Sequence, residues 1–67
     1  MDIRKRFGKR VKALREAKGW SQEELADRAG MHQTYISAVE RAVRNPTLTV
    51  IERIAKALKV PVPELFG

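Results

Sequence analysis

Cysteine is absent from the 67 residues, so neither a disulfide framework nor a metal site built on thiolates can stabilise the fold. Aromatic residues make up only 6% of the chain, and no apolar run approaches the roughly 18 residues that a membrane-spanning helix needs. A chain of this length buries only about 60% of its unfolded surface, which leaves little room for a large enclosed catalytic pocket. These absences predict a single small domain, residues 1–67, held together by helix packing.

Signals for secretion, catalysis and metal binding are also missing. The basic N-terminus lacks the apolar segment and the cleavage site of a signal peptide, which predicts a cytoplasmic protein. Glu23 and Glu24 have no nucleophile beside them, and near the start of a helix their charge suits the helix dipole. The only histidine, His32, has no neighbouring ligand set. We therefore expect no enzyme activity, no metal and no other cofactor.

Positive charge is present in excess, and it is concentrated in the first third of the chain. The net charge is +6; residues 1–20 hold eight Lys/Arg and two Asp/Glu, whereas residues 21–67 hold six of each. Because attraction to phosphates supplies most sequence-independent affinity for nucleic acid, a basic helix beside a neutral segment favours a polyanion-binding domain. A basic helix on an anionic membrane is the alternative. It is disfavoured because the apolar residues of this helix have core spacing: Ile3, Phe7, Val11 and Leu14.

The segment 21–41, SQEELADRAGMHQTYISAVER, has the pattern of two short helices joined by a tight turn. Ser21 and Glu24 stand in the S-x-x-E relation of a capping box, so a helix is expected to begin at Gln22. Its apolar stripe stops at Gly30, which can adopt a positive φ without a Cβ penalty and so turn the chain. A second helix is expected over residues 33–41. The segment therefore predicts a helix-turn-helix.

One face of this second helix is small, uncharged and able to form hydrogen bonds. An ordinary solvated face is rich in Lys and Glu, whereas a face that enters the major groove of DNA needs short side chains with donors and acceptors. Gln can pair with adenine, Thr and Ala can contact the thymine methyl, and Ser suits either base type. An exposed polar helix without a partner is the alternative. We expect base readout in double-stranded DNA by Gln33, Thr34, Ser37 and Ala38.

Periodicity and turn residues predict the remaining elements. A first helix is expected over residues 2–18, and Thr47 is a plausible cap for a fourth helix that ends near residue 58. Residues 62–66 are expected to form one last turn that places Leu65 or Phe66 on the core. The fourth helix supplies a core stripe of Leu48, Ile51, Ile54, Ala55 and Leu58. The fold class is therefore all-α, with five helices.

Several motifs along the chain resemble one known family. They are R-x-x-K-G-x-S-Q-E-E-L-A from Arg15, Y-I-S-x-x-E-R from Tyr35, N-P-T-L from Asn45, I-A-K-A-L from Ile54 and E-L-F from Glu64. Together they resemble the XRE family of phage repressors and Cro proteins, which implies a compact lambda-repressor-like DNA-binding domain. The run H-Q-T-Y-I-S, followed by E-R and R-N, is most similar to the controller proteins of restriction-modification systems.

The resemblance implies roles for further residues. Arg15 and Glu40 occupy positions where family members make a partly buried ion pair that joins the first helix to the reading helix. His32 either donates to a phosphate or serves as a poor helix cap, and Tyr35 either belongs to the core or reaches a phosphate or a base step. Contacts to the DNA backbone are expected from Gln22, His32, Tyr35, Arg41, Arg44 and Asn45.

Three residues depart from the family pattern. Ala42 and Lys59 stand where relatives usually have Gly at the end of a helix, so each turn is either strained or follows another route. Gln33 replaces an Arg that is common in controller proteins, which exchanges a guanine preference for an adenine preference. The binding site on DNA therefore cannot be copied from relatives.

A sequence-specific transcription regulator is the function that these features predict. One reading helix contacts few base pairs, so we expect a homodimer on a pseudo-palindrome with half-sites about 34 Å apart. The proposed dimer patch consists of Val50, Val60, Val62 and Phe66. The alternative is an antitoxin-like protein-interaction module. Activation would need a contact with RNA polymerase, which the sequence leaves open, and no domain that would sense a small-molecule effector is evident.

Overall fold

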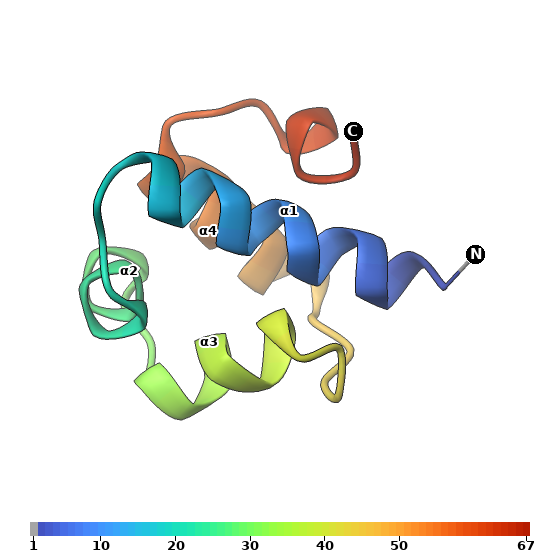
Figure 1. Ribbon diagram of the computed structural model, residues 1–67, viewed down its shortest axis with the longest axis horizontal. Helices are drawn as coiled ribbons and strands as arrows, with labels where there is room; N and C mark the ends of the chain where they lie inside the picture. The colour runs from blue at the N-terminus through green and yellow to red at the C-terminus, as the bar shows by residue number, and fades with distance from the viewer. Residues whose placement is uncertain (1) are drawn as a thin grey trace.

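The computed structural model describes residues 2–67, and in this part of the chain every regular element is helical. The elements are α1 (Ile3–Ala17), α2 (Gln22–Ala29), α3 (Gln33–Glu40), α4 (Leu48–Leu58) and the short 3-10 helix η1 (Val62–Leu65). Helix α1 lies across the molecule with α3 below it, α4 behind it and η1 above it, while α2 stands at one end (Figure 1). The all-α prediction is confirmed, and the fifth element is a single 3-10 turn.

Helix α1 begins at a side-chain cap and buries one stripe. The Asp2 carboxylate accepts a hydrogen bond from the Arg4 backbone N–H at 2.9 Å, and hydrogen bonds from Arg4 hold the pKa of this carboxyl below its usual value. Phe7 and Val11 are buried as predicted, but Ile3 is 61% exposed. The core assignment of Ile3 was wrong because the first turn of α1 extends past the other helices (Figure 1).

The helix-turn-helix forms largely as its local sequence predicts. The Ser21 hydroxyl accepts from the Glu24 N–H at 3.0 Å, and Gly30 has a left-handed φ of 70°. The reciprocal half of the capping box is replaced by another contact, because the Glu24 carboxylate accepts from Arg28 Nε at 2.7 Å. Helix α3 ends at Glu40, one residue earlier than predicted, with Arg41 as its C-cap.

The core lies where α1, α2, α3 and α4 meet, and η1 closes it. Thr47 caps α4 by accepting from the Val50 N–H at 3.2 Å, and Leu65 of η1 is completely buried. Leu48 is 85% exposed, so its assignment to the core stripe was wrong. It is the first residue of α4, directly after the Thr47 cap, and its side chain faces solvent. The buried apolar residues are Phe7, Val11, Leu25, Ala26, Ala29, Ile36, Val39, Ile54, Ala55, Leu58 and Leu65.

The two positions where relatives usually carry glycine keep a glycine-like backbone. Ala42 has φ 63° and Lys59 has φ 59°, and these are the non-glycine residues with positive φ in the described chain. The Val43 N–H donates to the Ala38 carbonyl at 3.0 Å, which closes the turn after α3. Of the two outcomes expected from the sequence, the strained turn is therefore the one that forms.

Ala42→Gly should stabilise the protein. Relief of left-handed strain is worth about 1–2 kcal/mol, whereas the added entropy of glycine in the unfolded chain costs about 0.4–1 kcal/mol. We expect the free energy of unfolding to rise by up to about 1 kcal/mol, measured by urea denaturation. The matched control is Ala13→Gly, on the exposed face of α1, which should lose about 1 kcal/mol. Equal losses at both positions would contradict strain at residue 42.

Candidate nucleic-acid interface

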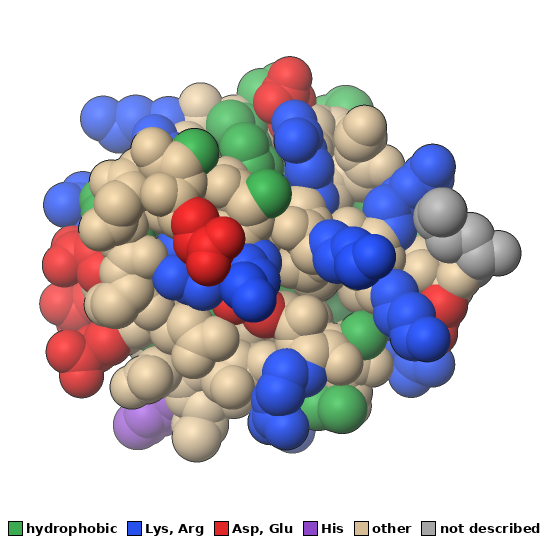
Figure 2. All heavy atoms as spheres, viewed as in Figure 1, with side chains coloured by type: hydrophobic (Ala, Val, Ile, Leu, Met, Phe, Trp, Pro, Cys, Tyr) green, Lys and Arg blue, Asp and Glu red, His purple; other side chains and the backbone are tan. Residues whose placement is uncertain are grey.

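Helix α3 presents the predicted readout residues on one outward face. Ile36 and Val39 are 0% and 1% exposed and turn inward, which fixes the rotation of the helix about its axis. Gln33 and Thr34 are exposed, whereas Ser37 and Ala38 are half-buried on the same outward side. In Figure 2 the lower edge, over α3, carries no acidic side chain and is flanked by one histidine and a Lys/Arg cluster. The four residues therefore form one continuous, nearly uncharged surface.

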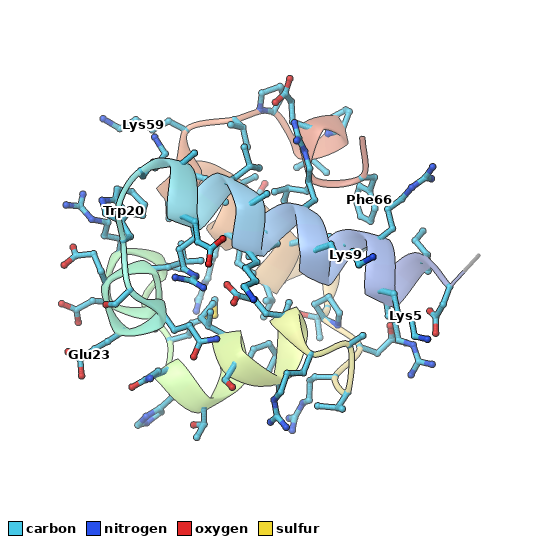
Figure 3. The ribbon with its side chains drawn as sticks, viewed as in Figure 1. Lys5, Lys9, Trp20, Glu23, Lys59 and Phe66 are labelled. Carbon is cyan, nitrogen blue, oxygen red and sulfur yellow. The ribbon has the colours of Figure 1, made fainter. Side chains whose placement is uncertain are left out.

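Charged side chains are distributed unevenly around this face. Acidic side chains gather at the left of the molecule, over α2 (Figure 2), and Glu23 points outward there (Figure 3). Glu23 and Asp27 line a shallow hollow together with His32 and Gln33 at the start of α3. A phosphate is repelled at this end of the reading face. Phosphates are better received beside α1 and beside the segment that follows α3.

The seven Lys and Arg residues of α1 divide into two groups. Three arginines are held in ion pairs within the described chain: Arg4 with Asp2 at 3.2 Å, Arg10 with Glu64 at 3.5 Å and Arg15 with Glu40 at 2.7 Å. The other four are exposed and make no ion pair among residues 2–67: Lys5, Arg6, Lys9 and Lys12. Lys5 and Lys9 point away from the body of the protein (Figure 3). Charge counting along the sequence could not separate these groups, since the acidic partners of two of the arginines are 25 and 54 residues away.

Arg15 and Glu40 form the ion pair that the family resemblance implies. Arg15 Nε and Nη2 donate to the two carboxylate oxygens at 2.7 and 3.0 Å, and Arg15 Nη1 donates to the Trp20 carbonyl at 2.7 Å. The side chains are only 10% and 3% exposed. The hydrogen bonds that Arg15 donates to Glu40 raise the pKa of Arg15 above its usual value, because they favour the charged guanidinium. The pair ties the end of α1 to the last residue of α3.

Gln22 takes part in the same cluster, which the sequence did not indicate. Its Nε2 donates to Glu40 Oε1 at 3.0 Å, across the space between the first residue of α2 and the last residue of α3. The side chain is only partly buried, so it remains open to solvent at its outer side. Spacing along the chain gave no signal for this contact, since the two residues are 18 positions apart.

The predicted backbone contacts after α3 also lie at the surface. Arg41, Arg44 and Asn45 are exposed, and the Arg44 guanidinium lies 5.0 Å from the centre of the Tyr35 ring, a cation–π distance. Tyr35 packs partly against the core, in keeping with the first of the two alternatives for this residue. His32 is the N-cap of α3 but makes no side-chain capping bond, and its imidazole is exposed. The five expected contacts outside α2 therefore lie at the start of α3, in its first half and in the segment that follows it.

The predicted dimer patch is mostly packed against the core. Val50, Val60 and Phe66 are partly buried there, and the Phe66 ring lies 5.2 Å from that of Phe7 (Figure 3). Only Val62, which is 39% exposed, counts as an exposed large apolar side chain. Leu48 is far more exposed and was not predicted as part of the patch. Which of these residues meet a second copy stays a prediction.

The described chain holds no group of three His, Cys, Asp or Glu side chains close enough to bind a metal ion. Within residues 2–67, none of the helices combines the length and apolar character that crossing a lipid bilayer requires.

Comparison with known proteins identifies the family of this site. The helix-turn-helix family HTH_3 matches residues 11–65. Control protein C.SmaI of Serratia marcescens is 45% identical over 66 residues, which cover 98% of this chain and 79% of that protein. The crystal structure of the restriction-modification controller protein C.AhdI from Aeromonas hydrophila superposes with a TM-score of 0.92 at 44% identity, over 94% of this chain and 96% of that one.

A third match is a structure with nucleic acid bound. The crystal structure of SinR, the master regulator for biofilm formation, in complex with DNA superposes with a TM-score of 0.85 at 37% identity, over 91% of this chain and 98% of that one. The family match spans more than half of the sequence, and the relatives agree with it in both sequence and fold. The resemblance seen in the motifs is confirmed: the chain belongs to the XRE-type helix-turn-helix family HTH_3.

Proposed function

We propose that this protein is a sequence-specific transcription regulator that binds double-stranded DNA as a homodimer. The observation that carries the proposal is the outward face of α3, which is short-chained and nearly uncharged where an ordinary exposed helix is charged. A relative of the same fold has been crystallised with DNA, which supports this function. The protein would act in the cytoplasm, where bacterial DNA lies.

In this proposal α3 enters the major groove and the cations beside it hold phosphates. Gln33, Thr34, Ser37 and Ala38 contact base edges. The exposed cations of α1 and the 41–45 segment flank that face without the opposing charge found at α2. Base contacts then supply specificity, and phosphate contacts supply affinity and orientation.

Selection of duplexes from a random pool tests the proposal directly. The expected result is enrichment of a pseudo-palindrome with half-sites about one helical turn apart, bound with a steep salt dependence. Retention of no duplex, or binding that is independent of both sequence and salt, would contradict the proposal and favour the antitoxin-like module. Transcription in vitro from the selected site, with purified RNA polymerase, distinguishes repression from activation.

Gln33→Ala and Arg44→Ala should weaken DNA binding in different ways. Loss of a base contact at Gln33 should cost about 1–3 kcal/mol on the selected site and relax one base position, with little change on random duplex. Loss of a phosphate contact at Arg44 should weaken binding to all sequences alike and reduce the salt slope by about 1. Binding titrations at four salt concentrations measure both. Equal losses of Gln33→Ala on the two duplexes would refute base readout.

The homodimer surface is proposed to include Leu48 as well as Val62. Both are exposed large apolar side chains; Leu48 is the first residue of α4 and Val62 is the first residue of η1. A symmetric dimer would cover this apolar surface twice and place two copies of α3 on successive turns of the duplex. Because the dimer is the form proposed to bind DNA, regulation would occur only at protein concentrations at which two copies associate.

Leu48→Ala should weaken the dimer without weakening the fold. Because the side chain is 85% exposed, its loss should change the free energy of unfolding of the monomer by less than about 0.5 kcal/mol. Burial against a second copy would make the same loss cost about 1–2 kcal/mol in dimerisation. Sedimentation equilibrium measures the dimer, and thermal melting serves as the control. An unchanged dimer constant would exclude Leu48 from the interface.

A controller role in a restriction-modification system is the narrower proposal. It is supported by the similarity to C.SmaI and C.AhdI, both of which are named as control or controller proteins. Genes for a methyltransferase and an endonuclease beside the gene for this protein are the expected observation. A neighbouring toxin gene would instead favour the antitoxin-like alternative.

A further inference from the structure

A shallow groove of about 600 Å³ runs along the side of α1 that faces η1. Helices α3 and η1 lie on opposite sides of α1 (Figure 1). A Cβ added to Gly8 would meet the Val39 and Glu40 carbonyl oxygens, so Gly8 marks the side that faces α3. Arg10 lies about half a turn further round the helix, and its Nε donates to the Glu64 carbonyl of η1 at 2.8 Å. The groove is therefore turned away from the reading helix.

Positive side chains dominate the lining of this groove. They are Lys5, Arg6, Lys9 and Arg10, and Ala13 lies among them. The first three are exposed and make no ion pair among residues 2–67. The acidic side chains nearby, those of Asp2 and Glu64, are already paired with arginines of α1. An anion in the groove would therefore meet three positive charges that nothing in the described chain opposes.

The composition of the groove favours a phosphate backbone over a protein or a small molecule. Protein interfaces are depleted in Lys and depend on large apolar or aromatic anchors, whereas the apolar lining described for this groove is a single alanine, Ala13. A small ligand needs a pocket that buries most of its surface, and this groove is open along α1. Clustered Lys and Arg on one helix face are typical of sequence-independent DNA binding, which is mainly electrostatic.

We propose that this groove is a second, sequence-independent DNA site, and that it holds a duplex other than the one that α3 reads. The inference goes beyond the proposed function, in which one duplex receives all the contacts. A straight duplex on the outward face of α3 is separated from Arg6 and Arg10 by α3 itself and by α1 (Figure 1). With both sites occupied, the protein bridges two segments of DNA.

A two-duplex capture experiment tests the inference. An immobilised selected duplex, no longer than the site, is saturated with protein, and a fluorescent random-sequence duplex is titrated at several salt concentrations. We expect the wild type to capture the second duplex with a salt slope of about −2.7, the value for three phosphate contacts. Arg6→Gln/Lys9→Gln should reduce the slope to about −0.9 and weaken capture by about 10-fold at low salt. Saturation of the first duplex separates this loss from any effect at α3.

The matched control removes the same charge from another helix. Arg53 and Lys56 are exposed on α4, and Arg53→Gln/Lys56→Gln should capture the second duplex as the wild type does. Equal losses in the two double variants would show that net charge alone acts, and would overturn the inference. A wild type that retains the selected duplex but captures no second one would also overturn it.

Failure of the wild type to bind the selected duplex specifically would instead count against the proposed function. Binding of the random duplex then decides the inference by itself. A loss in Arg6→Gln/Lys9→Gln that Arg53→Gln/Lys56→Gln does not share would support the groove, and the absence of binding would overturn it.

A measurement on the wild type identifies the surface that the second duplex contacts. In the saturated complex, random duplex should shift the backbone amide NMR signals of Lys5, Arg6 and Lys9 and leave those of α3 unchanged. Shifts at α3 instead, or no shifts, would overturn the inference. Poly-L-glutamate is the competing probe. If it shifts the groove signals at lower charge concentration than the duplex does, the occupant is an acidic protein segment and the DNA site is excluded.

Discussion

Replacing Arg15 by methionine is expected to lower the free energy of unfolding by about 3–5 kcal/mol, the largest effect of any single substitution considered. The change leaves Glu40 as a buried charge without its partner, since that carboxylate is only 3% exposed. It also removes the donor to the Trp20 carbonyl. A small domain has a total stability of roughly 0.05–0.15 kcal/mol per residue, so a measurable fraction of the variant should be unfolded at 25 °C.

Urea denaturation followed by circular dichroism measures this loss, and the matched control is the double variant Arg15→Met/Glu40→Leu. Replacing both partners of a buried ion pair by apolar side chains is often neutral or stabilising, so the double variant should recover most of the lost stability. Its DNA affinity should stay low, because Gln22 no longer has the carboxylate that holds its amide. A loss below about 1 kcal/mol in the single variant would show that water reaches Glu40 when Arg15 is absent.

Gly8→Ala is expected to destabilise the protein, although the same change inside a helix usually stabilises by about 1 kcal/mol. A Cβ at this position would lie 2.6 Å from the Val39 carbonyl oxygen and 2.8 Å from that of Glu40. Both are backbone atoms and cannot rotate away, so α1 and α3 would have to separate. Overpacking of this kind costs about 1–3 kcal/mol. The steric term therefore exceeds the propensity gain, and the sign reverses.

The consequence for function should be larger than the loss of stability alone. Gly8 lies against the end of α3, so a displaced contact tilts the reading helix and moves Glu40. Affinity for the selected duplex should fall more than affinity for random duplex, since only base readout depends on the position of α3 in the major groove. Ala13→Gly supplies the intrinsic difference between Gly and Ala in the same helix. If Gly8→Ala raises the melting temperature, α1 and α3 are not held at close approach.

Locally encoded features were predictable because their causes lie within four residues. The caps at Ser21 and Thr47 each accept from the N–H three residues on, and the left-handed residue at Gly30 closes the turn. The periodicity of α3 gave its inward and outward faces. Ile3 and Leu48 were misplaced for one shared reason. Each has the correct spacing but lies in the first turn of its helix, where the core has already ended.

The contacts that depend on helix packing could not be predicted in the same way. The Gln22 bond to Glu40 joins residues 18 positions apart, and the Gly8 contact joins α1 to the end of α3. The ion pair of Arg15 was expected from the family resemblance alone. The same holds for the left-handed turns at Ala42 and Lys59, for which the residues themselves indicate no glycine-like backbone.

The sequence by itself determined the helix-turn-helix, the uncharged readout face and the concentration of positive charge in α1, because each depends on residue type at short spacing. Only the tertiary structure decided which cations are bound in ion pairs, which apolar side chains are left at the surface, and how Glu40 holds Gln22. These outcomes depend on how closely the helices approach one another and on whether another helix covers the first turn of each. The periodicity of a single helix encodes neither of these.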